Sequence, residues 1–217
     1  MLKKFYFFLI IFFSYFNITY AETVNVFEFT ENELSILKIR KIKSADAMTS
    51  YSVGKNDNGN FLRAEATNAA SGLGKEININ LKETPYLNIT WKVERDLSGI
   101  NENSKKGHDF AARVFVVKKT GVTPLSNRAM NYVFSSNRKV NTHNPSPYTK
   151  KSIDYILSTT KEYLNKWVSV KINVRDHFKE FHKLDVNEIN GVAIMTDTDN
   201  SKLTSVAYYQ NIYFSSE

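Results

Sequence analysis

The chain has 217 residues, no cysteine, and a formal net charge of +7 from 29 basic and 22 acidic side chains. Without cysteine it has no disulfide, no thiolate zinc site and no thiol nucleophile, and a chain of this length is large enough to fold on a hydrophobic core alone. Its lysines are scattered and no nucleic-acid-binding motif occurs, so we expect no nucleic-acid partner. The charge is interpreted as solubility, with weak attraction to anionic glycans or lipid head groups as the alternative.

The first residues have the layout of a secretory signal peptide. Lys3 and Lys4 form a positive region, an apolar run follows from Phe5 to Phe16, and Thr19-Tyr20-Ala21 supplies small residues at a cleavage site. We predict cleavage after Ala21, which gives residues 1–21 as signal peptide, residues 22–217 as one domain, and an exported product that is periplasmic or secreted. An uncleaved anchor is the weaker alternative, because a spanning helix needs about 20 apolar residues, so no membrane span is expected after cleavage. The oligomeric state stays open.

Alternation of polar and apolar residues dominates the rest of the chain and is typical of half-buried β-strands. Residues 36–42 are either a strand or an amphipathic connector, and the segment 110–117 is the most apolar run, which predicts a central strand. The other predicted strands are 23–30, 48–53, 61–67, 77–81, 87–93, 129–135, 152–157, 167–174, 192–196 and 205–214. In the last of these, Val206, Tyr208, Ile212 and Phe214 are predicted to share one face.

Turns and loops separate these strands. Asn58-Gly59 favours a type I′ hairpin turn, and Ser71 to Gly74 is predicted to be a turn as well. The segments 96–107, 121–128 and 141–151 are predicted loops. One helix is expected over 176–184, with Asp176 as its cap and with Phe178 and Phe181 on one face. About ten to twelve strands with one short helix predict an all-β fold, an antiparallel β-sandwich of jelly-roll type.

Three polar residues come directly after the apolar strand 192–196. Asp197, Asp199 and Asn200 are candidate ligands for Ca²⁺, which takes about six to eight oxygen atoms. The spacing excludes an EF-hand, whose sixth and twelfth positions would be Lys202 and Tyr208. The alternative is a structural loop in which Asp and Asn side chains bind their own backbone.

A second candidate site surrounds the predicted central strand. Asp109 and Arg113 lie four residues apart and would share a face, either as a structural ion pair or as ligand contacts. Aromatic residues could supply a platform for stacking sugar rings, with core packing as the alternative for each of Trp91, Trp167, Tyr132, Tyr148, Tyr155, Tyr208, Tyr209 and Tyr213. Neither a nucleophile elbow, a zinc-protease motif nor a phosphate-binding loop occurs.

Several segments together resemble a known family. Ser71-Gly72-Leu73, the strand from Pro85 to Val93, Asp109 to Val114, Asn131-Tyr132 and Thr196 to Asn200 are similar, in this order, to the bacterial exported family catalogued as domain of unknown function 3047. The resemblance implies an exported protein with a galactose-binding-like jelly roll, as in many carbohydrate-binding modules, and no established activity. His108 and Ile89 stand where a second acid and a second Trp are common in the family, which weakens a metal or acid–base role beside Asp109 and an aromatic platform beside Trp91.

We therefore expect a non-catalytic module that binds a glycan or a cell-envelope component, with no catalytic residue assigned and Ca²⁺ as the candidate cofactor. The predicted ligand contacts are Trp91, Asp109, Arg113, Asn131, Tyr132, Asp197, Asp199 and Asn200. Two alternatives stay open. One is an enzyme acting on a glycan through Asp109, Asp197 and Asp199, and the other is an envelope scaffold or interaction protein.

Overall fold

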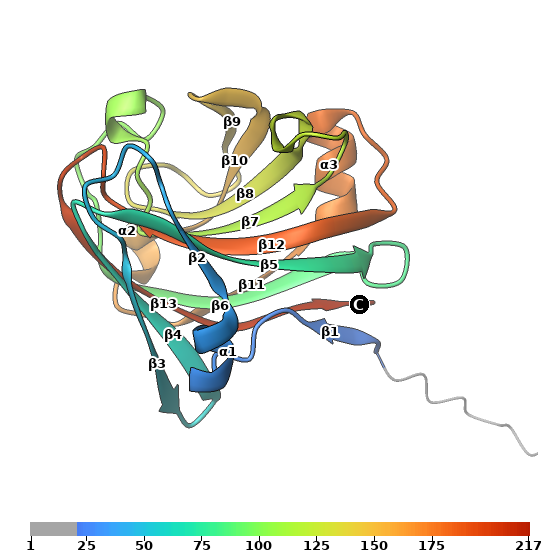
Figure 1. Ribbon diagram of the computed structural model, residues 1–217, viewed down its shortest axis with the longest axis horizontal. Helices are drawn as coiled ribbons and strands as arrows, with labels where there is room; N and C mark the ends of the chain where they lie inside the picture. The colour runs from blue at the N-terminus through green and yellow to red at the C-terminus, as the bar shows by residue number, and fades with distance from the viewer. Residues whose placement is uncertain (1–20) are drawn as a thin grey trace, which may run out of the picture.

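The computed structural model describes residues 21–217 and arranges them as two packed β-sheets (Figure 1). The predicted signal peptide lies outside the described residues, apart from Ala21. Within the described part of the chain, no helix is long and apolar enough to cross a membrane.

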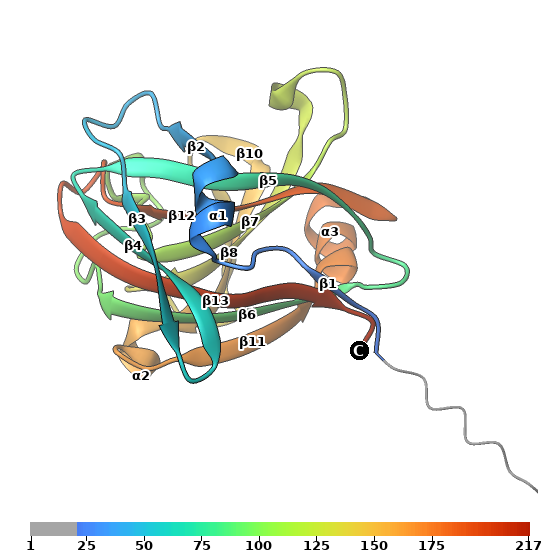
Figure 2. The same ribbon diagram turned by 60° about the horizontal axis from the view of Figure 1, so that its bottom comes forward.

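The smaller sheet has six strands and the larger sheet has seven. The order in the smaller sheet is β11 (Val168–Asn173), β6 (Tyr86–Arg95), β13 (Thr204–Ser215), β4 (Gly59–Thr67) and β3 (Ser50–Asn56), and β1 (Thr23–Asn25) also pairs with β13 (Figure 2). The order in the larger sheet is β2 (Lys38–Lys41), β5 (Ala70–Asn80), β12 (Glu188–Asp197), β7 (Ala112–Lys118), β8 (Arg128–Ser135), β10 (Thr149–Thr159) and β9 (His143–Ser146). The predicted β-sandwich is confirmed, and β7 is a central strand as expected.

One strand pair departs from the antiparallel prediction. β10 runs parallel to β8, whereas every other pairing is antiparallel among the described strands. The reason lies in residues 136–148, which return the chain to the end of the sheet where β8 begins. Within this segment β9 forms an extra edge strand on β10, where the sequence predicted only a loop.

Alternation places the core between the sheets. In β6, Leu87, Ile89, Trp91 and Val93 are each at most 1% exposed, as the sequence predicted. From the larger sheet, inward-facing residues of β7 and β12 join the same hydrophobic cluster. Burial of these apolar faces is the main force that holds the two sheets together.

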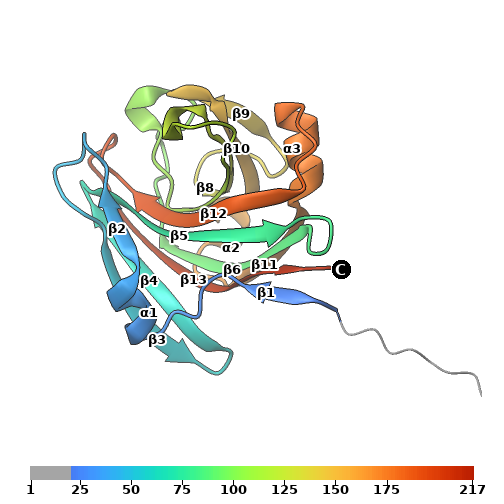
Figure 3. The ribbon, with the colours of Figure 1, turned by 45° about the vertical axis from the view of Figure 1, so that its right-hand side comes forward.

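The described part of the chain contains three α-helices, and the sequence predicted one of them. α3 (Val174–His182), at one end of the sandwich in Figure 3, begins two residues earlier than expected. Its cap is Asn173, whose side chain accepts a hydrogen bond from the Asp176 N–H at 3.1 Å, so the prediction that Asp176 caps the helix is wrong. Phe178 packs into the core. The short helices α1 (Glu31–Ile36) and α2 (Thr160–Tyr163) have too few residues to show a periodic pattern.

Two turn predictions are wrong. Ser71 to Gly74 lies inside β5, where β2 pairs on one side and β12 on the other. In the β3–β4 hairpin, Asn56 pairs with Gly59, so residues 57 and 58 form the loop. Within this loop and the flanking pair only Gly59 has a positive φ, of 111°, whereas a type I′ turn needs positive φ at both central residues.

The last strand changes phase in its middle. Ala207 and Tyr209 face the core, and so do Ile212 and Phe214, although the two pairs differ in parity. Asn211, with φ 49°, lies at the register shift that inverts the alternation. The prediction that Tyr208 shares a face with Ile212 is therefore wrong, and Tyr208 lies on the outer face beside Phe61, with ring centroids 5.6 Å apart.

Candidate functional site

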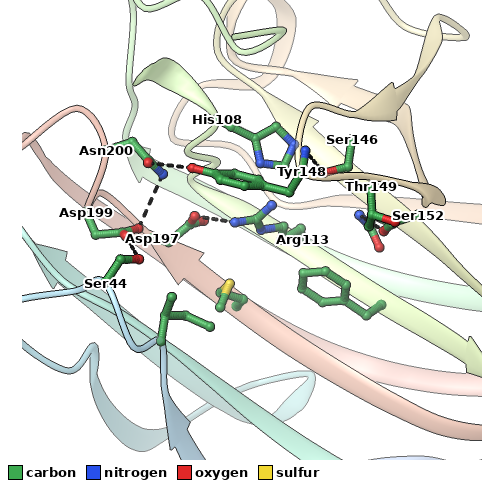
Figure 4. A pocket seen from close by; sticks show the side chains of 14 residues that line it. Ser44, His108, Arg113, Ser146, Tyr148, Thr149, Ser152, Asp197, Asp199 and Asn200 are labelled. Atoms are coloured by element: carbon green, nitrogen blue, oxygen red, sulfur yellow. Dashed lines mark hydrogen bonds and ion pairs between the residues drawn. The ribbon is translucent and has the colours of Figure 1, made fainter. Parts of the chain in front are cut away.

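A cavity of about 330 Å³ lies on the outer face of the larger sheet (Figure 4). The alternation of the strands explains its position. On β7, Arg113 and Phe115 point outward and alternate with the core residues Val114 and Val116. On β12, Met195 and Asp197 point outward in the same way. The lining residues are Ile42, Ser44, His108, Arg113, Phe115, Asn131, Ser146, Tyr148, Thr149, Ser152, Met195, Asp197, Asp199 and Asn200. Five of the eight predicted ligand contacts are therefore together in one place: Arg113, Asn131, Asp197, Asp199 and Asn200.

The centre of the site is a buried ion pair. Arg113 pairs with Met195 across the β7–β12 ladder, and Asp197 follows two residues later on the same face, so the guanidinium Nη2 donates to Asp197 Oδ2. The Phe110 N–H donates to the other oxygen, Oδ1, at 3.2 Å. The predicted pairing of Arg113 with Asp109 is wrong, because β7 begins at Ala112 and the alternation does not extend back to Asp109.

Asp109 lies beneath the site and is fully buried. Its Oδ1 accepts from the backbone N–H and the side-chain Nδ2 of Asn200, at 3.2 and 2.8 Å, and its Oδ2 accepts from the Ser201 N–H at 2.6 Å. Both oxygens are thus used to hold the turn after β12. The role of Asp109 is structural rather than contact with a ligand.

Oxygen atoms of Asp109, Asp197 and Asp199 lie within 4.8 Å of one another, and we call these three residues the acidic cluster. Burial raises the pKa of Asp197 to about 7, with Arg113 opposing the shift and Asp109 adding to it. Burial and the charge of Asp109 also raise the pKa of Asp199, whose Oδ2 accepts from the Ser44 hydroxyl at 3.3 Å.

The acidic cluster does not fit the predicted Ca²⁺ site. Both oxygens of Asp109 and both oxygens of Asp197 accept hydrogen bonds, and one donor is a guanidinium that already supplies a positive charge. Asn200 Oδ1 accepts from the Tyr148 hydroxyl at 2.8 Å. Asp199 is left as the one carboxylate of the cluster with only weak contacts, whereas Ca²⁺ needs about six to eight oxygen atoms.

The lining residues Asn131 and Arg113 each have a polar side-chain atom without a hydrogen-bond partner within the described residues. Asn131 Nδ2 donates to Ser152 Oγ and to Asp154 Oδ1, both at 2.7 Å, and Asp154 also pairs with His108 at 2.7 Å. Asn131 Oδ1 and Arg113 Nε are buried and have no hydrogen-bond partner within residues 21–217. Asn131 and Arg113 are 2% and 5% exposed, so water does not reach these atoms freely. An acceptor and a donor without partners therefore belong to residues that line the cavity.

Two predicted aromatic contacts are wrong. Trp91 is fully buried between the sheets, where its Nε1–H donates to Ser158 Oγ at 3.1 Å. Tyr132 is also fully buried, on the core face of β8 and next to the His177 ring of α3. Neither ring has a face that a sugar could stack on.

The family model described as "Protein of unknown function (DUF3047)" matches residues 37–213. The chain belongs to this family. No curated protein matches the sequence.

Solved structures are similar to this DUF3047 chain only at a distance. A family 30 carbohydrate-binding module of a Clostridium thermocellum cellulosomal cellulase has 11% identity and a TM-score of 0.43, over 91% of each chain. A cellulase derived from Cel12A of Rhodothermus marinus has 10% identity and a TM-score of 0.46, over 90% of this chain and 96% of the other. A Griffonia simplicifolia lectin has 12% identity and a TM-score of 0.35, over 91% and 98%.

Sequence reasoning missed much of the lining of the DUF3047 cavity. Phe115 and Met195, which the sequence did not mark as candidates, form apolar floor. Tyr148, 55% exposed, lies at the rim and was one of the aromatic residues that could supply a platform, although it was not a predicted ligand contact. One signal was available: β7 and β12 have apolar residues on both faces, which indicates that the outer face is covered or binds something. Ser44, Ser146, Thr149 and Ser152 come from loops and strand ends, where no local pattern marks them.

Proposed function

We propose that this protein binds a glycan in the cavity on the outer face of the larger sheet and does not catalyse a reaction on it. The observation that carries the proposal is the pair of buried, unpartnered atoms, Asn131 Oδ1 and Arg113 Nε, in the cavity wall. A buried polar atom without a partner costs about 1–3 kcal/mol, so a ligand that supplies the missing partners is stabilised. Sugar hydroxyls both donate and accept, which matches an acceptor and a donor that each lack a partner.

The remaining lining supports the same chemistry. Hydroxyl groups of Ser44, Thr149 and Ser152 surround the cavity, while Phe115 and Tyr148 offer aromatic surface to the apolar face of a sugar ring. A volume of about 330 Å³ is at the lower end of small-ligand sites, which span about 300–1,000 Å³. One or two sugar residues would fill it.

A glycan array followed by calorimetry tests the proposal. Phe115→Ala removes apolar floor, and Phe61→Ala is the matched control, because Phe61 is also half-buried but lies on the outer face of the smaller sheet. We expect Phe115→Ala to weaken glycan binding about tenfold and Phe61→Ala to leave it unchanged. Arg113→Lys keeps a cation beside Asp197 but lacks the Nε donor, and should also weaken binding. Absence of binding to every glycan class, or equal loss in both Phe variants, would refute the proposal.

A glycan-active enzyme is the second candidate, and the raised pKa of Asp199 is the observation that favours it. A general acid needs a pKa near the working pH, and glycoside hydrolysis needs a second free carboxylate nearby. Asp109 and Asp197 have both oxygens engaged, which leaves Asp199 without such a partner. If Asp199→Asn abolishes release of reducing sugar from a bound polysaccharide while affinity persists, the protein is an enzyme.

We also propose export and an envelope partner, on the N-terminal pattern of a positive region, an apolar run and Ala21. N-terminal sequencing of the protein recovered from the periplasm or the medium should begin at Glu22. A stoichiometric protein partner in place of a glycan would favour the alternative of an envelope scaffold.

A further inference from the structure

Beyond the cavity, small residues occupy the outer face of the larger sheet as far as the edge strand β2, and we call this strip over Ala193, Gly74 and Gly72 the trough. Strand register places Phe115, a floor residue, beside Ala193, then Gly74, then Lys38 of the edge strand β2. The neighbouring row runs from Arg113 through Met195 and Gly72 to Arg40. Strands lie about 4.8 Å apart, so the four steps from β8 to β2 extend the site to about 19 Å.

The two glycines of β5, Gly72 and Gly74, are half-buried, and room remains above both of them. A Cβ atom at Gly72 would have Ile194 O and Met195 Cε as its nearest neighbours, both at 3.9 Å, and at Gly74 the nearest would be Ala193 Cβ at 3.5 Å. Every one of these neighbours belongs to β12 itself, so no covering loop packs on the glycines. Neither glycine has a positive φ. Backbone geometry and packing therefore do not require glycine here, and its effect is to leave space above the sheet.

Two cations border the end of this trough. Lys38 and Arg40 are exposed on β2, the edge strand beside β5 in Figure 2, and neither takes part in an ion pair within residues 21–217. The nearby acid Glu76 is paired with Lys119 at 3.2 Å. The contact with Lys119 is the main cause that lowers the pKa of Glu76. The charges of Lys38 and Arg40 lower this pKa as well, so both side chains lie close enough to Glu76 to act on it. This end of the trough thus has an excess of positive charge.

We infer that the ligand is an extended acidic polysaccharide that lies across the strands of the larger sheet. One residue occupies the cavity, where Asn131 Oδ1 and Arg113 Nε meet its hydroxyls. The next residues pass over Gly74 and Gly72, and carboxylate or sulfate groups reach Lys38 and Arg40. The inference rests on the proposed function, which needs only the cavity.

The test compares acidic polymers (polygalacturonate, alginate, hyaluronan) with neutral ones (methyl-esterified pectin, dextran, xylan) and with their mono- and disaccharides. Polygalacturonate and methyl-esterified pectin share a backbone and differ in charge, so they are the sharpest pair. We expect acidic polymers to bind more tightly, with an affinity that falls as salt increases.

Variants separate the trough from the cavity. Lys38→Gln with Arg40→Gln should weaken polymer binding about tenfold at low salt, which corresponds to two exposed charge contacts. Lys55→Gln with Lys171→Gln, exposed lysines of the smaller sheet, is the matched control and should change nothing. Gly74→Val fills the trough and should weaken polymers about tenfold or more while leaving mono- and disaccharides unaffected. Gly72→Val, with more room around its Cβ, is the second variant if Gly74→Val lowers the melting temperature.

The outcomes are distinct. Neutral polymers that bind as well as acidic ones, with no loss in the glycine variants, would overturn the inference and leave glycan binding in the cavity standing. Equal losses in the Lys38/Arg40 variant and in its control would mean unspecific charge attraction and would overturn the inference too. Binding of no saccharide of any length would refute the proposed function itself.

Discussion

Replacing Arg113 by methionine isolates the charge at the centre of the site. Arg113→Met keeps an apolar side chain of similar length but leaves the Asp197 carboxylate, only 2% exposed, without its cation. Removing one partner of a buried ion pair costs about 3–5 kcal/mol. The Phe110 N–H still donates to Asp197, so we expect the lower end of that range, about 3 kcal/mol, at pH 8.

The loss of stability in Arg113→Met should depend on pH, and the direction of this dependence follows from the pKa of Asp197. Burial raises that pKa from 3.8 to about 7. Between these values the folded state binds more protons than the unfolded state, so the free energy of unfolding falls as pH rises from about 4 to about 7. A shift of about three units corresponds to about 4 kcal/mol across this range. Arg113 lowers this pKa, so Arg113→Met raises it further and moves the fall to higher pH.

Urea unfolding at pH 5, 6.5 and 8 measures this. At pH 5 Asp197 is protonated in both proteins, so the variant has no buried carboxylate without a cation. Its free energy of unfolding should therefore be within about 1 kcal/mol of the wild-type value. At pH 8 the full difference of about 3 kcal/mol should be present. The double variant Arg113→Met/Asp197→Asn removes the charge and should be more stable than the single variant at pH 8. An equal loss at both pH values, with no recovery in the double variant, would refute the reasoning.

Three further predictions concern Asp109, Trp91 and the acidic cluster. Asp109→Ala removes the acceptor for Asn200 and Ser201, and we expect a loss of about 3 kcal/mol by urea unfolding together with lost glycan binding; unchanged stability would contradict the structural role. Trp91→Phe removes a buried hydrogen bond to Ser158 and part of the ring, which should cost about 1–3 kcal/mol in unfolding experiments while glycan affinity stays unchanged. Millimolar CaCl₂ or EGTA should leave the melting temperature unchanged by calorimetry, since Asp199 is the one carboxylate of the acidic cluster whose oxygens have only weak contacts; a rise with CaCl₂ that EGTA reverses would contradict that argument.

The strands were predictable because their signal is local. In β6 every second residue from Leu87 to Val93 is apolar, and burial follows that pattern without any information from the rest of the chain. Errors arose where distant segments decide the outcome. Ser71 to Gly74 has the composition of a turn, but pairing with β2 and β12 on both sides holds it extended. In β13 the alternation inverts at Asn211, and a single bulge of this kind leaves no mark that the sequence reveals.

The candidate site was predictable in part. Arg113 and Asp197 were chosen as polar residues within or beside apolar strands, and polar residues in such places have a partner or a ligand. Asn131 was chosen because its segment resembles the family. Trp91 and Tyr132 were chosen for their ring type, which does not say which face of the sheet they occupy. Arg113 meets Asp197 only because β7 and β12 are neighbouring strands in the observed register. The two residues are 84 positions apart in the sequence, and alternation within one strand does not predict which strands pair.

The charges along the extended site give the proposed polymer a direction. At one end Asp199 adds a carboxylate that no cation contacts directly in the described structure, because Arg113 is engaged with Asp197. At the other end Lys38 and Arg40 form no ion pair within the described residues, and the nearby acid Glu76 is paired with Lys119. A uronate or sulfate placed beside Asp199 would repel it, and the same group placed on β2 would be attracted. We therefore expect an acidic chain that has a neutral residue at one end to bind with that residue in the cavity and its anionic residues toward β2, since the reverse orientation would bring like charges together.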